Sequence, residues 1–375
     1  MQYSSIFIIV RLQHNKKHFC YYSEVFMAEK LQNVVPNRVW LSLTGICDND
    51  CLWCLRKGSE IATFLNRDFI VRVAKTLSEC GTKSCVITGG EPTLHPEFSS
   101  IADDLCSFFQ FCNLITNGRS FSNGIPLSVI KNIPHLSISV SMHGTNREHY
   151  FANTGASEGF DEMCQGLKNL RDRNIGFSVN VVLCPENLGN VGDCIALAKK
   201  FEAKSLCFTF GLPSLDDTRQ YKTDPVLIAD AIPDIFRLCK KLEQKCCFVI
   251  SLPWCLIEEM TLREIMAEKS LMFNCPVFTG NAVTIKENRA ISLCTHTTGF
   301  ELVCPSEIDS VISSSQSFID FWSGSEMSRL RRTIDVFRHR KCTNCDYRWW
   351  CRGGCPLWWN SFDFSGMISN KEGDP

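Results

Sequence analysis

The sequence has little that would direct the chain to a membrane or out of the cell. No window approaches the about 20 apolar residues that a membrane span needs. The apolar run Ile6–Val10 is short, and no small-residue cleavage site follows it, so we find no signal peptide. The net charge is only -1, which argues against a general binder of nucleic acid. We therefore expect a cytoplasmic protein with no membrane and no nucleic-acid partner.

Cysteine, in contrast, is abundant. The chain has 23 cysteines among 375 residues, and 45% of its residues are hydrophobic. Disulfides usually staple small secreted domains, whereas a chain of this length can bury a core without them. Thiols in an intracellular protein stay reduced and are available as metal ligands. The composition therefore favours a metal-binding protein.

Apolar segments typical of strands alternate with amphipathic helical segments over about 170 residues. Continuously apolar strands in such an alternation indicate a parallel sheet covered by helices. We predict an α/β fold, a partial (β/α)6 TIM-type barrel with its chemistry in the loops after the strands. The expected strands are 38–44, 84–90, 112–118, 136–144, 176–183 and 205–211, and the expected helices are 67–80, 97–110, 160–174 and 188–201.

The flanking segments differ in character from the predicted barrel. The first residues lack a clear period, and Met27 is an alternative start. Residues 226–270 have a helical, amphipathic pattern, and the chain from Cys275 onward is rich in Cys, Trp, Arg and Gly. The last part is expected to be a small Cys-rich iron–sulfur domain built around metal. The expected divisions are an N-terminal extension 1–36, a barrel 37–215, a helical bridge 216–274 and a C-terminal domain 275–375.

Three cysteines follow the first predicted strand in the stretch CDNDCLWC: Cys47, Cys51 and Cys54. No fourth cysteine lies nearby. Structural zinc usually takes two pairs of ligands, so a loop with three cysteines fits zinc poorly. A [4Fe–4S] cluster takes one thiolate for each iron. Three cysteines could hold three irons and leave the fourth open to a substrate or cofactor.

This C-x3-C-x2-C spacing after a first strand resembles the signature of the radical S-adenosylmethionine (radical SAM) superfamily, and Trp53 matches its aromatic position. The stretch GGEP after the second strand strengthens the resemblance. In the family it binds the amino group of the methionine part of SAM. Two glycines let the backbone approach a ligand, and a carboxylate can accept from an ammonium. The alternative is an ordinary turn. The expected SAM-binding residues here are Gly89, Gly90, Glu91 and Pro92.

Polar residues end the third and fourth predicted strands. In similar enzymes such residues touch the methionine carboxylate or the ribose, which makes Asn117, Ser139 and Ser141 candidates. Relatives often have Asp where this chain has His143. An ordinary strand-end polar group is an equal alternative for each. Asn187 is instead expected to cap a helix that begins near residue 188.

A second cysteine constellation lies near the C-terminus. Its spacing is C-x2-C-x5-C-x3-C, and a predicted hairpin with two more cysteines precedes it. The arrangement resembles a SPASM domain, which carries auxiliary [4Fe–4S] clusters. A zinc ribbon is the alternative. The cysteines concerned are Cys275, Cys294, Cys342, Cys345, Cys351 and Cys355.

The chain departs from that pattern in three places. No cysteine follows Cys355, so a second auxiliary cluster lacks its expected last ligand, for which Asp363, another side chain or a bound substrate are candidates. Cys255, with Cys304 as the alternative, is the expected extra ligand of the first auxiliary cluster. Arg289 stands where relatives usually have Gly. One or two auxiliary clusters are therefore expected.

The resemblance implies an enzyme that reductively cleaves SAM to a 5′-deoxyadenosyl radical and abstracts hydrogen from a substrate. Relatives of this layout mostly modify a peptide or protein, and an external one-electron reductant of the flavodoxin or ferredoxin type supplies the electron. We expect the segment before Cys47 to be too short for the leader-binding domain of many peptide maturases, so that another surface or a separate protein would recognise the peptide. The alternatives are an anaerobic sulfatase-maturase-like protein oxidase, a radical SAM enzyme acting on a small molecule, and a non-catalytic iron–sulfur or zinc protein.

Cys207 lies on the sixth predicted strand. The default expectation for the cysteines outside the two constellations is a buried thiol that behaves as a small apolar group. Cys207 could also point into the barrel, where a catalytic thiol is the alternative.

Overall fold

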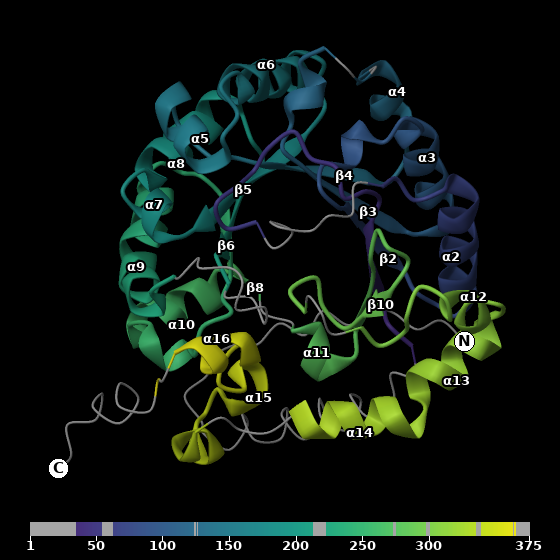
Figure 1. Cartoon of the computed structure of the whole chain (residues 1–375). Helices are drawn as coiled ribbons and strands as arrows, with labels where there is room; N and C mark the ends of the chain where they lie inside the picture. The colour runs from purple at the N-terminus through teal and green to yellow at the C-terminus, as the bar shows by residue number, and fades with distance from the viewer. Residues whose placement is uncertain are drawn as a thin grey trace. The chain divides into compact units, whose positions relative to one another are not determined.

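The strands of the described part of the chain form a sheet of ten, whose order is β10-β9-β1-β2-β3-β4-β5-β6-β7-β8. All neighbouring pairs are parallel except β9 and β10. The view in Figure 1 shows the strands curved around an axis with helices outside them. The bounds are β1 (Arg38–Ser42), β2 (Ser84–Thr88), β3 (Phe111–Thr116), β4 (Leu136–Ser141), β5 (Phe177–Leu183), β6 (Leu206–Phe210), β7 (Cys246–Val249), β8 (Leu271–Met272), β9 (Ala282–Ile285) and β10 (Ile291–Ser292).

This computed structural model describes residues 35–54, 63–123, 125, 127–212, 223–272, 275–297, 301–334, 339–362 and 364. These residues belong to one compact unit, Val34–Pro375. The expectations for residues 1–34, for the alternative start at Met27 and for Asp363 lie outside them. Within this part of the chain, no helix is long and apolar enough to cross a membrane.

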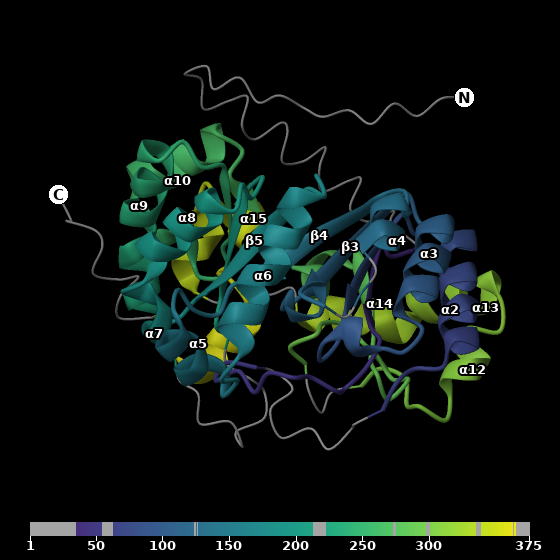
Figure 2. The ribbon, with the colours of Figure 1, turned by 90° about the horizontal axis from the view of Figure 1, so that it is seen from above.

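The predicted alternation of strands and helices is confirmed, and with it the α/β fold of a partial barrel. Helices cover the outer face of the sheet, as seen from above in Figure 2. The helices of this layer are α2 (Arg67–Glu79), α3 (Phe98–Phe108), α4 (Leu127–Asn132), α5 (Arg147–Thr154), α6 (Gly159–Asp172), α7 (Pro185–Leu188), α8 (Val191–Lys200) and α9 (Pro225–Lys241). Short 3-10 turns, η1 (Pro92–Leu94) and η2 (Arg119–Phe121), follow β2 and β3.

The two faces of the sheet differ in polarity. Side chains alternate between the faces along a strand. On the outer face, Phe208 of β6 stacks on Phe248 of β7, and Phe236 of α9 packs against Phe248. On the inner face, Ser178 and Asn180 of β5 are half-buried. The core therefore lies between sheet and helices, and the inner face carries polar groups that solvent reaches.

The prediction that residues 226–270 are helical throughout was wrong. Helix α9 is followed by β7, the 3-10 turn η3 (Trp254–Leu256), helix α10 (Glu259–Ala267) and then β8. A short apolar run such as Cys246–Val249 fits a buried strand or a buried helix equally well in sequence. Pairing with β6 decides in favour of a strand.

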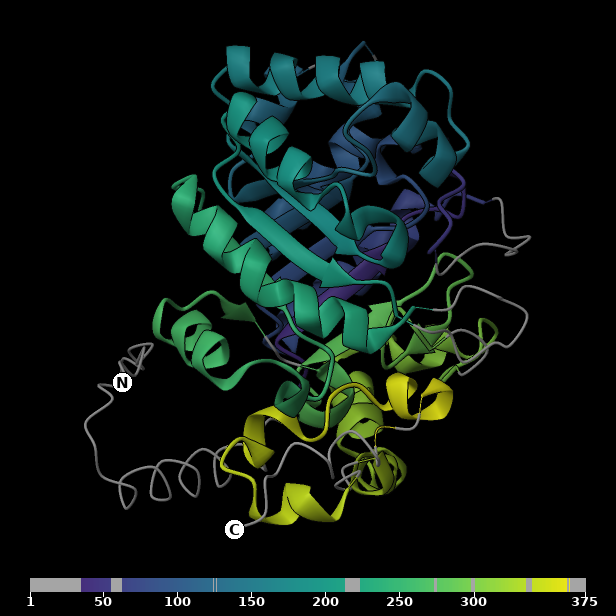
Figure 3. The same cartoon turned by 90° about the vertical axis from the view of Figure 1, so that its left-hand side faces the viewer.

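The hairpin predicted between Cys275 and Cys294 is confirmed as β9 and β10. The sequence did not indicate that β9 would also pair in parallel with β1 and so extend the sheet. Figure 3 shows the remaining C-terminal helices below the barrel. They are α11 (Pro276–Thr279), α12 (Ile308–Val311), α13 (Ser315–Ser323), α14 (Ser325–Ile334), the 3-10 turn η4 (Arg340–Asn344), α15 (Arg348–Cys351) and α16 (Pro356–Ser361).

Candidate functional site

The loop after β1 carries the first three cysteines. Cys47 is exposed, Cys51 is buried and Cys54 is half-buried. Although the Cys47 residue is exposed, desolvation of its thiol by the surrounding protein raises the pKa to about 12, and the nearby Cys54 thiol adds to this. Burial likewise raises the pKa of Cys51, with Cys54 and Cys47 contributing. The three sulfurs therefore lie close enough to influence one another.

Within the described residues, no three His, Cys, Asp or Glu side chains are already gathered into a metal-binding group. The donor set of the loop nevertheless fits an iron–sulfur cluster, because it offers three neighbouring thiols and soft sulfur ligands suit iron–sulfur chemistry. The loop backbone forms a tight turn in which Cys54 N donates to Cys51 O at 3.0 Å. To bind a cluster, the three cysteine side chains would have to rotate on this backbone so that their sulfurs point to one place.

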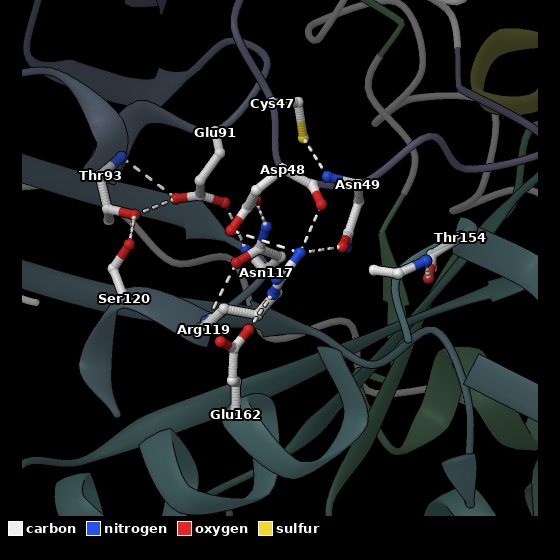
Figure 4. A network of polar contacts seen from close by, with 12 residues as sticks. Cys47, Asp48, Asn49, Glu91, Thr93, Asn117, Arg119, Ser120, Thr154 and Glu162 are labelled. Carbon is white, nitrogen blue, oxygen red and sulfur yellow. Dashed lines mark hydrogen bonds and ion pairs between the residues drawn. The ribbon is translucent and has the colours of Figure 1, made fainter. Parts of the chain in front are cut away.

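Arg119, at the start of η2, holds the cysteine loop from one side (Figure 4). Its Nη1 donates to the backbone oxygen of Asp48 and, at 2.8 Å, to Oδ1 of Asn49. Its Nε donates to Glu162 Oε2 of α6 at 2.6 Å. The sequence reading did not identify Arg119. Its only local signal is its place two residues after Asn117.

Helix α5 holds the same loop from the other side. The backbone nitrogens of Asp50 and Leu52 donate to the carbonyl oxygens of Thr154 and Asn153 at 2.8 and 3.0 Å. These carbonyls lie at the C-terminal end of the helix, where backbone acceptors are free. The loop is thus fixed by the fold before any cluster binds.

The two glycines of GGEP let β2 approach the cysteine loop closely. Gly90 N and Glu91 N donate to Thr44 O and Ile46 O, both at 2.7 Å. A Cβ on Gly89, whose φ is 146°, would lie 2.6 Å from Thr44 O, and a Cβ on Gly90 would overlap Ile46 O. Any larger residue would push the two loops apart.

Glu91 is almost fully buried, and its carboxylate is surrounded by donors of the protein itself. Oε1 accepts from the backbone nitrogen of Thr93 at 3.1 Å and from the hydroxyls of Thr93 and Thr116 at 2.5 and 2.7 Å. Oε2 accepts from the backbone nitrogen of Asn117 at 2.7 Å. Burial raises the pKa of Glu91, while these hydrogen bonds oppose the rise. The side chain therefore ties the end of β2 to the end of β3.

Asn117 continues this connection to the cysteine loop. Its Nδ2 donates to Asp48 Oδ1 at 2.6 Å, and its Oδ1 accepts from Arg119 N at 3.0 Å. Of the other predicted SAM-binding residues, Ser139 shares a hydrogen bond with Ser178 of β5 at 2.9 Å, and Ser141 is buried at the end of β4. The cysteine loop and the ends of β2, β3 and β4 thus form one site.

Comparison with known families identifies the domain in which these residues lie. Residues 41–198 match the model of the radical SAM superfamily. These residues are a radical SAM domain. The match begins in β1 and ends in α8, so it contains the cysteine loop, GGEP and the polar strand ends.

Individual relatives share parts of this domain. The chain is 24% identical over 178 residues to the antilisterial bacteriocin subtilosin biosynthesis protein AlbA of Bacillus subtilis, covering 47% of this chain and 40% of that protein. It is 30% identical over 151 residues to GTP 3′,8-cyclase of Vibrio vulnificus, and this match covers 38% of this chain and 44% of that protein. The chain thus spans less than half the length of these relatives.

Two solved structures resemble most of the chain in fold. Streptococcus suis SuiB bound to precursor peptide SuiA superposes with a TM-score of 0.69 at 14% identity, over 96% of this chain and 81% of that chain. Native anSMEcpe with bound AdoMet superposes with a TM-score of 0.65 at 14% identity, over 88% of this chain and 92% of that chain.

In the radical SAM domain, Trp53 and His143 lie against each other, with ring centroids 5.5 Å apart. His143 is buried, and its Nδ1 has no hydrogen-bond partner among the described residues. Burial lowers the pKa of His143 to about 4, so the imidazole is neutral at pH 7. The sequence showed only that His143 replaces the usual Asp. The lack of a hydrogen-bond partner for His143 Nδ1 among the described residues is seen only in the structure.

His143 should make the protein sensitive to mild acid. Because its pKa is lowered in the folded state, stability is full above pH 6.5 and is lost as the pH falls toward 4. At roughly 1.4 kcal/mol for each unit of pKa shift, the free energy of unfolding should fall by about 3 kcal/mol over this pH range. Urea unfolding of wild type and His143→Gln at pH 7, 6, 5 and 4.5 measures it. The variant should lose less stability with acid, and parallel pH curves would contradict the assignment.

The predicted helix cap at Asn187 was wrong. Asn187 lies inside α7, before α8 begins at Val191. Its Oδ1 accepts from Asn153 Nδ2 at 2.8 Å, and its Nδ2 donates to Val182 O at 2.9 Å. The side chain therefore connects β5 to α5, the helix that holds the cysteine loop of the radical SAM domain.

The C-terminal cysteines lie in two places. Burial raises the pKa of Cys275 to about 12, and the nearby Cys294 thiol adds to this. In the other place, Trp254 N donates to Cys351 Sγ at 3.3 Å, and burial raises the pKa of Cys351 to about 12 with Cys255 contributing. The turn that carries Cys255 thus packs against the Cys351 turn.

Proposed function

We propose that this protein is a radical SAM enzyme that abstracts hydrogen from a peptide or protein substrate. The observation that carries the proposal is the loop of Cys47, Cys51 and Cys54, which the fold fixes within a radical SAM domain. These cysteines would hold a [4Fe–4S] cluster that, with SAM, supplies a 5′-deoxyadenosyl radical. A chain with 23 cysteines suits a reducing compartment such as the cytoplasm, where a flavodoxin or ferredoxin type of reductant is at hand.

The residues of this chain would position that chemistry. Arg119 and the end of α5 hold the cysteine loop in place. Glu91 sets the position of Asn117, which in turn contacts Asp48 of the loop. Trp53 of the cysteine loop and the buried Ser141 at the end of β4 are our candidates for contacts with bound SAM.

A peptide is favoured as the substrate because the likeness to SuiB bound to its precursor peptide extends over 96% of this chain. A small-molecule substrate is the second candidate, favoured by the 30% identity to GTP 3′,8-cyclase. That likeness covers only 38% of this chain and leaves the C-terminal cysteines unexplained. A sulfatase-maturase-like oxidation and a peptide crosslink are both compatible with the site.

We also infer a SPASM-like domain from Cys275 onward. Cys275, Cys294 and Cys355 would serve one auxiliary cluster. Cys342, Cys345 and Cys351 would serve a second, for which Cys255 is our candidate fourth ligand. This assignment moves Cys255 from the first auxiliary cluster to the second. Its support is the packing of the Cys255 turn against Cys351 and the contribution of Cys255 to the Cys351 pKa.

The proposal is tested by anaerobic reconstitution with iron and sulfide, followed by SAM and dithionite. Wild type should release 5′-deoxyadenosine, and Cys47→Ala should fall to the background rate. Cys164→Ser, on the outer helix α6, is the matched control and should behave as wild type. A mass change in a short peptide encoded beside the gene would support the peptide substrate. Equal release of 5′-deoxyadenosine from wild type and Cys47→Ala would refute the enzyme proposal.

A further inference from the structure

Four residues form a row across the inner face of the sheet. The strand register pairs Ser141 of β4 with Asn180 of β5, Asn180 with Cys207 of β6, and Cys207 with Cys247 of β7. Neighbouring strands are about 4.8 Å apart, so Cys207 lies two strand spacings, roughly 10 Å, from Ser141. The row therefore connects a predicted SAM-binding residue with a pair of thiols.

The side chains of this row point into the barrel. Residues paired in a parallel register share a face, and the neighbouring positions Phe208 and Phe248 face the helices. Thr209, two residues after Cys207, donates to Asn180 Oδ1 at 3.3 Å, which places both on the inner face. Cys207 and Cys247 are half-buried, so small molecules can reach them.

The two thiols contact each other. A hydrogen bond to Cys247 raises the pKa of the Cys207 thiol, and burial adds to this. The same hydrogen bond lowers the pKa of Cys247. Cys207 thus keeps its proton at neutral pH, so it is a poor nucleophile and metal ligand but retains an intact S–H bond.

Another thiol pair in the sheet shows what distinguishes this one. Cys85 of β2 and Cys112 of β3 are also paired in register, and both are 1% exposed. Cys112 contacts both Cys85 and Cys106 of α3, so the pair lies in the core between sheet and helices. A substrate inside the barrel could meet the Cys207 pair but not this one.

We propose that Cys207 is a hydrogen-atom donor on the inner wall of the barrel, held in place by Cys247. This inference rests on the proposed function, which generates a carbon radical in the barrel. An S–H bond is weaker than a C–H bond, so a thiol readily passes its hydrogen atom to such a radical. The hydroxyl and amide groups beside it cannot do so, because their O–H and N–H bonds are stronger.

The step balances as follows. The carbon radical takes the hydrogen atom of Cys207, so a C–H bond forms, the S–H bond breaks and a thiyl radical remains on Cys207. One electron from the external one-electron reductant and one proton from water restore the thiol. Cys247, in contact with the sulfur, donates a hydrogen bond to the thiolate formed between these two events. The hydrogen delivered to carbon therefore comes from an exchangeable site.

The test needs no peptide. Reconstituted enzyme is equilibrated in D₂O, so that its thiols carry deuterium, and is then given SAM and dithionite. The 5′-deoxyadenosine formed is examined by mass spectrometry. In wild type it should carry deuterium, because without a substrate the 5′-deoxyadenosyl radical takes its hydrogen atom from Cys207. Cys207→Ser and Cys207→Ala should lower the deuterated fraction several-fold, and Cys164→Ser should leave it unchanged.

Each outcome decides the inference. A deuterated fraction that is the same in wild type and both Cys207 variants would overturn it, as would undeuterated product from wild type. In those two cases SAM is still cleaved, so the proposed function stands. If wild type cleaves no SAM at all, the proposed function fails and this inference fails with it. Urea unfolding of each variant confirms that the fold is retained.

Discussion

Replacing Cys47, Cys51 and Cys54 together by Ala is expected to remove about four iron atoms from each reconstituted chain, since a cubane cluster would lose all its protein ligands on that loop. Iron bound to the triple variant then reports on the C-terminal cysteines alone. In that background, Cys255→Ala should lower the iron content further. The turn of Cys255 packs against Cys351, so the substitution would remove the fourth ligand of the second cluster. Iron and sulfide analysis measures both effects.

The matched control for this series is Cys304→Ala in the same background. Cys304 is exposed, as Cys255 is, and it was the alternative extra ligand in the sequence. We expect its replacement to leave the iron content unchanged. If Cys304→Ala lowers iron and Cys255→Ala does not, the assignment of Cys255 is wrong. A zinc ion bound by four thiolates, in place of an iron–sulfur cluster, would give a colourless protein that contains zinc.

Sequence patterns correctly predicted the strands, helices and motifs that depend on residues close to one another in the chain. The six strands from Arg38 to Phe210 were found because apolar runs alternate with amphipathic helices over this part of the chain. The cysteine spacing and GGEP were found because their chemistry depends on neighbours in sequence. Pairing of β9 with β1 joins residues more than 240 positions apart, and no local pattern encodes such a partner.

The same limit applies within the site. Arg119 has no distinctive sequence context, yet it contacts Asp48, Asn49 and Glu162, which come from two distant segments. Glu91 was expected to face the ammonium of SAM. That contact stays a prediction, and the structure adds four hydrogen bonds from the protein to the same carboxylate. Burial and partner geometry arise only when the strands meet, so sequence spacing cannot supply them.

Glu91→Gln is therefore expected to affect stability as well as cofactor binding. The substitution keeps the shape of the side chain but replaces one acceptor oxygen by an NH₂ donor. With the amide oxygen at the Oε1 position, the contacts from Thr93 and Thr116 persist, and the NH₂ group faces the backbone N–H of Asn117. Two donors then oppose each other in a buried place. Removing the buried charge also removes its desolvation penalty, which offsets part of this effect. We therefore expect the free energy of unfolding to fall by about 2–4 kcal/mol.

Urea unfolding measures this loss as a lower midpoint at an unchanged slope. Glu97→Gln is the matched control, because the Glu97 side chain is 53% exposed and lies 4.0 Å from Arg67, an arrangement worth little to stability. Loss of the Asn117 contact should also free the Asn117 side chain that reaches Asp48, and so loosen the cysteine loop. Glu91→Gln should then bind SAM more weakly even where it remains folded, as equilibrium dialysis can show. Wild-type stability together with weak SAM binding would instead mean that Glu91 acts on the ligand alone.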